Sequence, residues 1–291
     1  EGAAYNGSAY IFRRNEADGT WNQYKQIFAS DPGDNQYFGT SVAISDDTIA
    51  VGANGDDGSS LSRGSVYMYY IDEGGADNWG QVAKITPSDG NDYDLFGSSV
   101  SIDGDILKAG AYGGPNATYR GAAYIYYRNT GGGNNWGEII KLTEPAGTDF
   151  SNFGHSVSVS GDLAVVGAYG HDNFKGAAYV FQRDMGGPDQ WGLMSQVQPT
   201  DIEDWDYFGY SVDIYENYVI CGSPFNDSLG TDRGAAYIFY VHLDEFYEYG
   251  LTVVSEVIKL TASEENDFDL FGEAVAINKN TVVIGATNHD E

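Results

Sequence analysis

The stretch FGHSVSVSGDLAVVGA, residues 153–168, decides the fold. Within it, Val157 and Val159 alternate with serines, which is typical of a half-buried strand. Gly161-Asp162 follows as a two-residue hairpin signal, and a second apolar strand then runs to Gly167-Ala168. The stretch therefore predicts an antiparallel hairpin with one buried face.

This hairpin is one part of a unit that occurs five times. Its Phe-Gly returns at intervals of 58, 57, 55 and 63 residues, at Phe38-Gly39, Phe96-Gly97, Phe153-Gly154, Phe208-Gly209 and Phe271-Gly272. After each hairpin and a polar loop, a third strand opens with Gly, two small residues and Tyr, as in 7–10, 64–67, 121–124, 176–179 and 234–237. A Trp leads into a fourth strand at Trp21, Trp79, Trp136 and Trp191.

Four short antiparallel strands per unit, repeated at this period, predict the blades of a β-propeller. We expect one all-β domain over residues 1–291, with blades at about 38–87, 96–143, 153–200, 208–262, and 271–291 plus 1–29. The chain starts and stops inside a repeat. Pairing strand 7–13 with strand 281–286 would complete the fifth blade and remove exposed sheet edges. We therefore expect a five-bladed ring that is closed by joining the N- and C-terminal strands, and an arc that further sequence completes is the alternative.

The charge balance restricts the partners. The chain has 14 basic and 43 acidic residues, a formal net charge of −29. Such a surface repels phosphate backbones, so we expect no nucleic-acid partner. No apolar run approaches the roughly 20 residues that cross a bilayer, so we expect no membrane insertion of this segment. The single cysteine, Cys221, is expected to be a small buried residue.

The Phe-Gly and Gly-Ala units resemble those of the FG-GAP repeat family, which includes the integrin α-subunit propeller. The resemblance covers nearly the whole chain and implies an extracellular or cell-surface, secreted location and a role in adhesion, structure or binding. Integrin-type repeats often carry a calcium loop between the first two strands. Here that connection is a two-residue turn in all five units, so the family's calcium site does not carry over.

Acidic residues concentrate in the connections between blades. An aspartate stands four residues before every Phe, and a second one stands two residues before three of them: Asp34, Asp92, Asp94, Asp149, Asp204, Asp206, Asp267 and Asp269. Calcium prefers several oxygen ligands, so these residues are candidate metal ligands with Ca²⁺ as the candidate cofactor. The alternative is that each aspartate caps its own turn through a hydrogen bond to the backbone.

Because strand direction alternates within a blade, the loops between second and third strands lie on the same face as the connections between blades. Candidate ligand contacts there are Asp56, Asp57, Asp172, Asp227 and Asp232. His155 follows Phe-Gly at a variable position, where either a ligand contact or a solvated side chain is expected. Three sequons are candidate glycosylation sites: Asn6, Asn116 and Asn226.

Signals for catalysis are poor. The four histidines lack metal-ligand spacing, and the sequence has neither a nucleophile elbow nor a phosphate loop. We therefore expect a non-catalytic binding or adhesion module whose acidic face binds a protein or glycan, with or without divalent cations, or which self-associates in a surface assembly. Two alternatives remain open: a lectin-like carbohydrate binder that uses exposed Tyr and Trp, and an enzyme with a site in the central channel.

Overall fold

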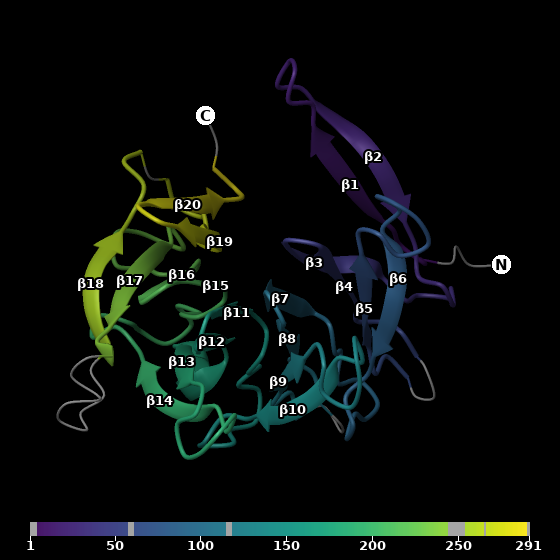
Figure 1. Cartoon of the computed structure of the whole chain (residues 1–291). Helices are drawn as coiled ribbons and strands as arrows, with labels where there is room; N and C mark the ends of the chain where they lie inside the picture. Colours follow the sequence, from purple (N-terminus) through teal and green to yellow (C-terminus); the bar gives the residue numbers. More distant parts are fainter. Residues whose placement is uncertain (1–4, 58–60, 115–117, 244–253, 265, 290–291) are drawn as a thin grey trace.

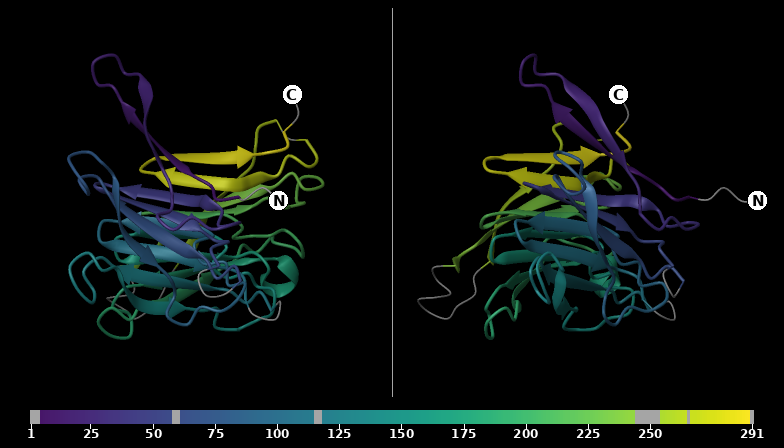
Figure 2. Two further views of the ribbon diagram at one scale, coloured as in Figure 1. Left: turned by 90° about the vertical axis from the view of Figure 1, so that its right-hand side faces the viewer. Right: turned by 45° about the vertical axis from the view of Figure 1, so that its right-hand side comes forward.

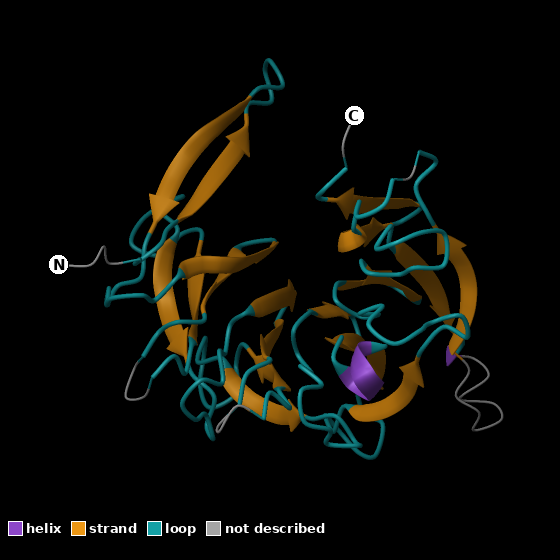
Figure 3. Cartoon of the chain, turned by 180° about the vertical axis from the view of Figure 1, so that it is seen from behind, coloured by secondary structure: helices purple, strands orange, loops and turns teal. Residues whose placement is uncertain are grey.

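A computed structural model describes residues 5–57, 61–114, 118–243, 254–264 and 266–289 of the chain. The regular secondary structure of the described part is almost entirely β (Figure 3). Its α1 (His171–Phe174) is a four-residue turn with positive φ at Asp172 and Asn173. No helix among the described residues is long and apolar enough to cross a membrane.

Four complete blades each contain four antiparallel strands in chain order. The first blade is β3 (Phe38–Ser45), β4 (Thr48–Ala53), β5 (Ser65–Tyr70) and β6 (Gly80–Ile85). The second blade is β7 (Ser99–Asp103), β8 (Ile106–Ala111), β9 (Ala122–Tyr127) and β10 (Gly137–Leu142). The third is β11 (Val157–Ser160), β12 (Leu163–Ala168), β13 (Ala177–Gln182) and β14 (Gly192–Val197). The fourth is β15 (Val212–Tyr215), β16 (Tyr218–Ser223), β17 (Ala235–Val241) and β18 (Val254–Leu260).

The fifth unit is divided between the ends of the chain. The N-terminal sheet consists of β1 (Ala9–Arg14) and β2 (Trp21–Ile27), and the C-terminal sheet of β19 (Phe271–Asn278) and β20 (Thr281–Ala286). Figure 1 shows the blades around a centre, with the first strand of each nearest to it. This arrangement confirms the all-β propeller fold.

The predicted closure is not formed in this structure. Among the described residues, β1–β2 and β19–β20 are two separate two-stranded sheets, and strand 7–13 does not pair with strand 281–286. The two sheets stand apart at the open end of the arc (Figure 1), and Figure 2 shows the N-terminal sheet rising at a steep angle to the C-terminal one. The complementary sequence of the two half-units does not bring them together here.

The core lies between neighbouring blades. Phe96 packs edge-on against Tyr124 at 5.5 Å and Tyr126 at 5.9 Å between ring centroids, and all three side chains are buried. Residues of the first blade such as Met68 belong to the same apolar cluster. The equivalent Phe, Phe153, packs in the cluster between the second and third blades. Each blade therefore buries its faces against the blades beside it.

Glycine makes this close stacking possible. A Cβ at Gly110 would lie 1.9 Å from the backbone oxygen of Gly154, so any side chain at Gly110 would push the second and third blades apart. Gly121 has φ of +71° and forms a parallel bridge with Phe153 of the next blade. The recurrent Gly-Ala and Phe-Gly signals are thus contacts between the backbones of successive blades.

Candidate binding site on the loop face

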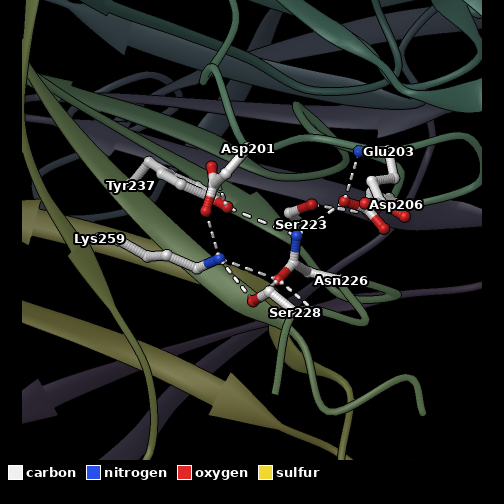
Figure 4. A network of polar contacts seen from close by, with 8 residues as sticks. All are labelled: Asp201, Glu203, Asp206, Ser223, Asn226, Ser228, Tyr237 and Lys259. Atoms are coloured by element: carbon white, nitrogen blue, oxygen red, sulfur yellow. Dashed lines mark hydrogen bonds and ion pairs between the residues drawn. The ribbon is translucent and has the colours of Figure 1, made fainter. Parts of the chain in front are cut away.

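The loop face comprises the loops between second and third strands together with the connections between blades. Its best-formed cluster lies in the fourth blade (Figure 4). There the hydroxyl of Tyr237 donates to Asp201 Oδ1 at 3.1 Å, and Lys259 Nζ donates to Asp201 Oδ2 at 2.7 Å. Tyr237 comes from the third strand, Lys259 from the fourth and Asp201 from the connection before the blade. The repeat therefore brings a phenol, an ammonium and a carboxylate together.

The same three-residue cluster recurs in two other blades. In the first blade, Tyr67 and Lys84 donate to Asp31 at 2.9 and 2.6 Å. In the second blade, Tyr124 and Lys141 donate to Asp89 at 2.8 and 2.6 Å. The tyrosine that marks the third strand in the sequence is thus also a hydrogen-bond donor at the loop face.

The third blade contains a variant of this cluster. Tyr179 and His171 both contact Glu144 Oε1, at 2.9 and 2.5 Å, and Thr148 contacts the other oxygen. Burial raises the pKa of Glu144, but hydrogen bonds from His171, Thr148, Ser151 and Tyr179 outweigh burial and lower the pKa to about 2. Glu144 is therefore held as a carboxylate in the folded protein.

The aspartates two residues before Phe are buried turn residues. Asp94 Oδ2 accepts the backbone N–H of Asn91 at 2.7 Å, and the equivalent bonds reach Asp206 at 2.9 Å and Asp269 at 2.7 Å. Their exposed fractions are 7%, 2% and 1% respectively. Burial raises the pKa of Asp94 and of Asp206. These contacts are those of turn caps.

Three of the five aspartates four residues before Phe form ion pairs instead. Asp149 contacts Arg120 at 2.6 Å, Asp204 contacts Lys175 at 3.6 Å, and Asp267 contacts Arg233 at 2.9 Å. Each cation directly precedes the Gly that opens a third strand. Sequence analysis missed this pairing, although the basic residues recur at one position of the repeat: Arg63, Arg120, Lys175 and Arg233.

Among the described residues, no group of three or more His, Cys, Asp or Glu side chains is placed to hold a metal ion. In the first blade, Asp34, Asp56 and Asp57 line one cavity of about 240 Å³. Lys84 lines it too, and its Nζ lies 2.6 Å from Asp56. The structure does not bring Asp92 or Asp149 to this cavity.

The remaining predicted contacts have distinct surroundings. Asp56 is 3% exposed and accepts from Tyr67, so it is part of the first cluster and not of the open surface. Asp57 and Asp227 are exposed and cap their loops by accepting N–H groups five residues later, at 2.8 and 2.7 Å. The backbone N–H group that Asp227 accepts belongs to Asp232. Asp172 lies 3.7 Å from the ammonium group of Lys175.

His155 is neither exposed filler nor an open ligand contact. It is half-buried, and its ring lies 4.7 Å from Tyr169 and 4.6 Å from Tyr210. Its Nδ1 lies 2.9 Å from the carbonyl oxygen of Tyr210. Burial lowers the pKa of His155.

The sequons differ in accessibility. Asn6 is exposed, and Asn116 lies outside the described residues. The prediction of a glycosylation site at Asn226 is corrected, because this residue is 1% exposed and its Nδ2 donates to Asp206 Oδ2 at 2.7 Å. A glycan on that nitrogen would remove the hydrogen bond and would not fit the buried site.

Four aromatic residues on the loop face were missed entirely. Tyr93, Phe150, Trp205 and Phe268 stand three residues before Phe in successive units, have φ between +64° and +75°, and are 50–58% exposed. Such φ values are outliers for bulky side chains. We call these four residues the aromatic arc. The recurrence of an aromatic residue at this position is visible in the sequence, but its left-handed backbone is not, because that conformation is expected at Gly or Asn. Asn35 occupies the fifth copy.

Comparison with known proteins places the fold. A search of curated proteins finds no match. The crystal structure of Saccharomyces cerevisiae Sqt1 is similar, with a TM-score of 0.52 and 10% identity over 98% of this chain, and the match spans 64% of Sqt1. At that identity the likeness concerns fold alone. The model of the FG-GAP repeat matches residues 21–69, 79–126, 136–181, 191–239 and 254–291. The protein therefore belongs to the FG-GAP repeat family.

Proposed function

We propose that this protein is a non-catalytic, extracellular or cell-surface interaction module that binds a partner protein through its loop face. The aromatic arc is the observation that carries the proposal. The N–H groups of Tyr93 and Phe150 donate to Leu61 and Thr118 at 2.7 and 2.6 Å, so the fold fixes their backbone. This backbone does not require aromatic side chains, because asparagine would adopt the same positive φ at a lower free-energy cost.

Exposed aromatics of this kind suit an interface. Large, rigid rings bury much area at low cost in conformational entropy, and they dominate binding energy in protein interfaces. The net charge of −29 favours a partner with a basic surface, which it would attract at long range. Adhesion follows if such a partner lies on another cell or in a matrix.

The test uses immobilised protein and a panel of extracellular matrix proteins. Tyr93→Ala with Trp205→Ala should weaken retention of a bound matrix protein by at least tenfold, at unchanged melting temperature. Tyr218→Ala is the matched control, because Tyr218 is 41% exposed beside the turn at 216–217 on the opposite face. Equal retention by the double variant and the control would remove the aromatic arc from the interface.

Divalent cations, calcium first, are part of this proposal. The carboxylates around the cavity of the first blade, which include Asp34, repel one another by about 1–4 kcal/mol per pair at 4 Å, depending on the dielectric. A cation that binds only the folded state raises the melting temperature. Calcium should therefore stabilise more than sodium at equal ionic strength. An equal effect of the two salts would leave only screening.

A lectin-like function is the second candidate. It is favoured by the ring of Phe174, which stacks on Trp205 at 4.7 Å with an interplanar angle of 11° and forms a flat apolar platform. Glycan-array binding that disappears in Trp205→Ala, without binding to any matrix protein, would replace the leading proposal by this one.

A further inference from the structure

The fourth blade contains a carboxamide in a fitted slot (Figure 4). Asn226 Nδ2 donates to Asp206 Oδ2 at 2.7 Å, while Asn226 Oδ1 accepts from Lys259 Nζ at 3.1 Å. The hydroxyl of Tyr237 lies 3.4 Å from Asn226 Nδ2. One acceptor and one cationic donor on opposite sides thus recognise both ends of the amide group.

The second blade carries the same partners around an open space. Asp94 is equivalent to Asp206, and it likewise accepts a backbone N–H group from three residues earlier, that of Asn91 at 2.7 Å. Tyr124 and Lys141 repeat Tyr237 and Lys259, with the same two contacts to the preceding carboxylate at 2.8 and 2.6 Å. The position equivalent to Asn226 is Gly114, so the blade has the slot without the side chain.

The backbone does not require glycine at this position. A Cβ at Gly114 would lie 3.2 Å from the side-chain hydroxyl of Thr118 and in ordinary contact with the backbone nitrogens of Tyr119 and Arg120, at 3.4 and 3.7 Å. Gly114 is also outside the left-handed region. The preceding Gly113 is different, because its Cβ would lie 1.9 Å from the backbone oxygen of Tyr93. The fold therefore demands the first glycine of this pair but not the second.

The place of the omitted side chain lies in a cavity of about 610 Å³, whose lining includes Asp94, Gly114, Tyr124 and Lys141 and extends to Arg120 and Glu144. The equivalent cavity of the first blade measures about 240 Å³, and there the Asp56 carboxylate stands at the position of Gly114. We name the larger cavity the Gly114 slot. It can admit a side chain from another molecule.

We propose that the Gly114 slot binds the carboxamide of an asparagine or glutamine side chain of a partner protein. Asp94 accepts from its NH₂ group and Lys141 donates to its carbonyl oxygen, as Asp206 and Lys259 do for Asn226. A carboxylate of the same shape would be repelled by Asp94 and would leave it without a donor. The recognition of a carboxamide rests on the slot alone, and only its source, a partner protein, rests on the proposed function.

The experiment titrates the full chain with propionamide, which is the end of a glutamine side chain, and follows backbone amide signals by NMR. Saturable shifts should occur at Asn91, Gly114 and Thr118, and isosteric propionate should bind at least tenfold more weakly. Gly114→Asn fills the slot and should abolish the shifts, while Gly114→Ala adds one methyl group and should retain them. N-acetylglutamine amide against N-acetylglutamate amide then tests the side chain on a peptide.

Each outcome decides the proposal. Equal binding of propionamide and propionate, or propionamide shifts that persist in Gly114→Asn, would overturn it. Binding of glucose without binding of propionamide would assign the slot to a saccharide instead. Loss of matrix retention in the aromatic-arc variants leaves these titrations unchanged, so the two proposals fail separately.

Discussion

The second blade and the N-terminal sheet are built from the same repeat, yet their side chains have opposite surroundings. Trp136 is 2% exposed and its Nε1 donates to the hydroxyl of Tyr70 in the preceding blade at 2.8 Å. Trp21 occupies the same place in its unit and is 67% exposed. The strand-three tyrosines differ in the same way, with Tyr124 at 0% and Tyr10 at 52%.

This difference shows that the repeat encodes an interface rather than a self-contained sheet. An inner blade buries both faces because a neighbour lies on each side, whereas an end sheet presents the same apolar pattern to solvent. The C-terminal sheet agrees, because Val283 is 68% exposed where Val165 of the third blade is 0% exposed. Burial in this protein is therefore a property of the junction between units.

The largest effect is expected from removing the buried indole. Trp136→Ala should reduce the free energy of unfolding by about 3–5 kcal/mol, because it leaves a cavity at the junction. Trp21→Ala should change it by about 0.5 kcal/mol or less, as for other exposed positions. Urea denaturation of both variants measures the contrast. Similar losses in the two would show that the end sheet is covered in solution.

The glycines should show the next largest contrast. Gly110→Ala drives a methyl group into the Gly154 carbonyl and should cost about 3 kcal/mol. In the C-terminal sheet, the Cβ of Gly285→Ala would meet its nearest atom, on Ala274, at 3.5 Å, which is ordinary contact. That variant should be neutral or slightly stabilising in a thermal melt. A tolerated alanine at Gly110 would disprove the backbone contact between blades.

A stabilising change is expected at Lys108, which is 0% exposed and donates to the carbonyl oxygen of Val165 at 2.8 Å. Burial lowers the pKa of Lys108 well below its usual value. Lys108→Met should raise the free energy of unfolding by about 1–3 kcal/mol, since the cost of burying the amine exceeds the gain from its one hydrogen bond to Val165. Val283→Lys, at the equivalent but exposed place, should be nearly silent.

The pH dependence follows from the same burial. Between the lowered folded pKa of Lys108 and the unfolded value of 10.5, the unfolded chain binds more protons. The wild-type free energy of unfolding should therefore rise with pH across that window relative to Lys108→Met. Denaturation of both proteins at several pH values measures the difference. A constant difference would mean that Lys108 keeps its proton when folded.

The smallest effect is expected in the aromatic arc. Phe268→Asn replaces a bulky residue at φ of 72° by one that favours this region, so the protein should gain about 0.5–1 kcal/mol. The same change at the half-buried Phe271, which packs between the fourth blade and the C-terminal sheet, should destabilise. A loss of stability in Phe268→Asn would show that its ring contributes to packing.

The fold could be predicted from the sequence because short local signals determine it and recur in every unit. Phe-Gly, the two-residue turn and Gly-Ala each act within one unit or across one junction, so five copies reinforce one another. Closure was predicted from complementary half-units, and the separate end sheets do not follow it. The sequence could not show that Asp149 pairs with Arg120, since this requires knowing that two loops of one junction meet.

The candidate site was less accessible to prediction. Turn capping was the alternative for both sets of aspartates, and the structure shows it at Asp94 and its equivalents two residues before Phe, because their side chains turn inward. The Gly114 slot depends on an absent side chain, which becomes visible only when its partners Asp94 and Lys141 are seen around it. Patterns of residue types report what is present, and this site is defined by what one blade omits.

The backbone contact at Gly110 also has a consequence for folding cooperativity. Because Gly52, Gly167 and Gly222 make the same contact at three other junctions, each blade is coupled chiefly to its nearest neighbours, as units are in a one-dimensional array. In such an array, opening begins at the termini, where a unit has one neighbour. Amide hydrogens in β12 and β13 should then exchange with solvent most slowly, and those of β1 and β20 most rapidly, so that the exchange rates record the distance from each end.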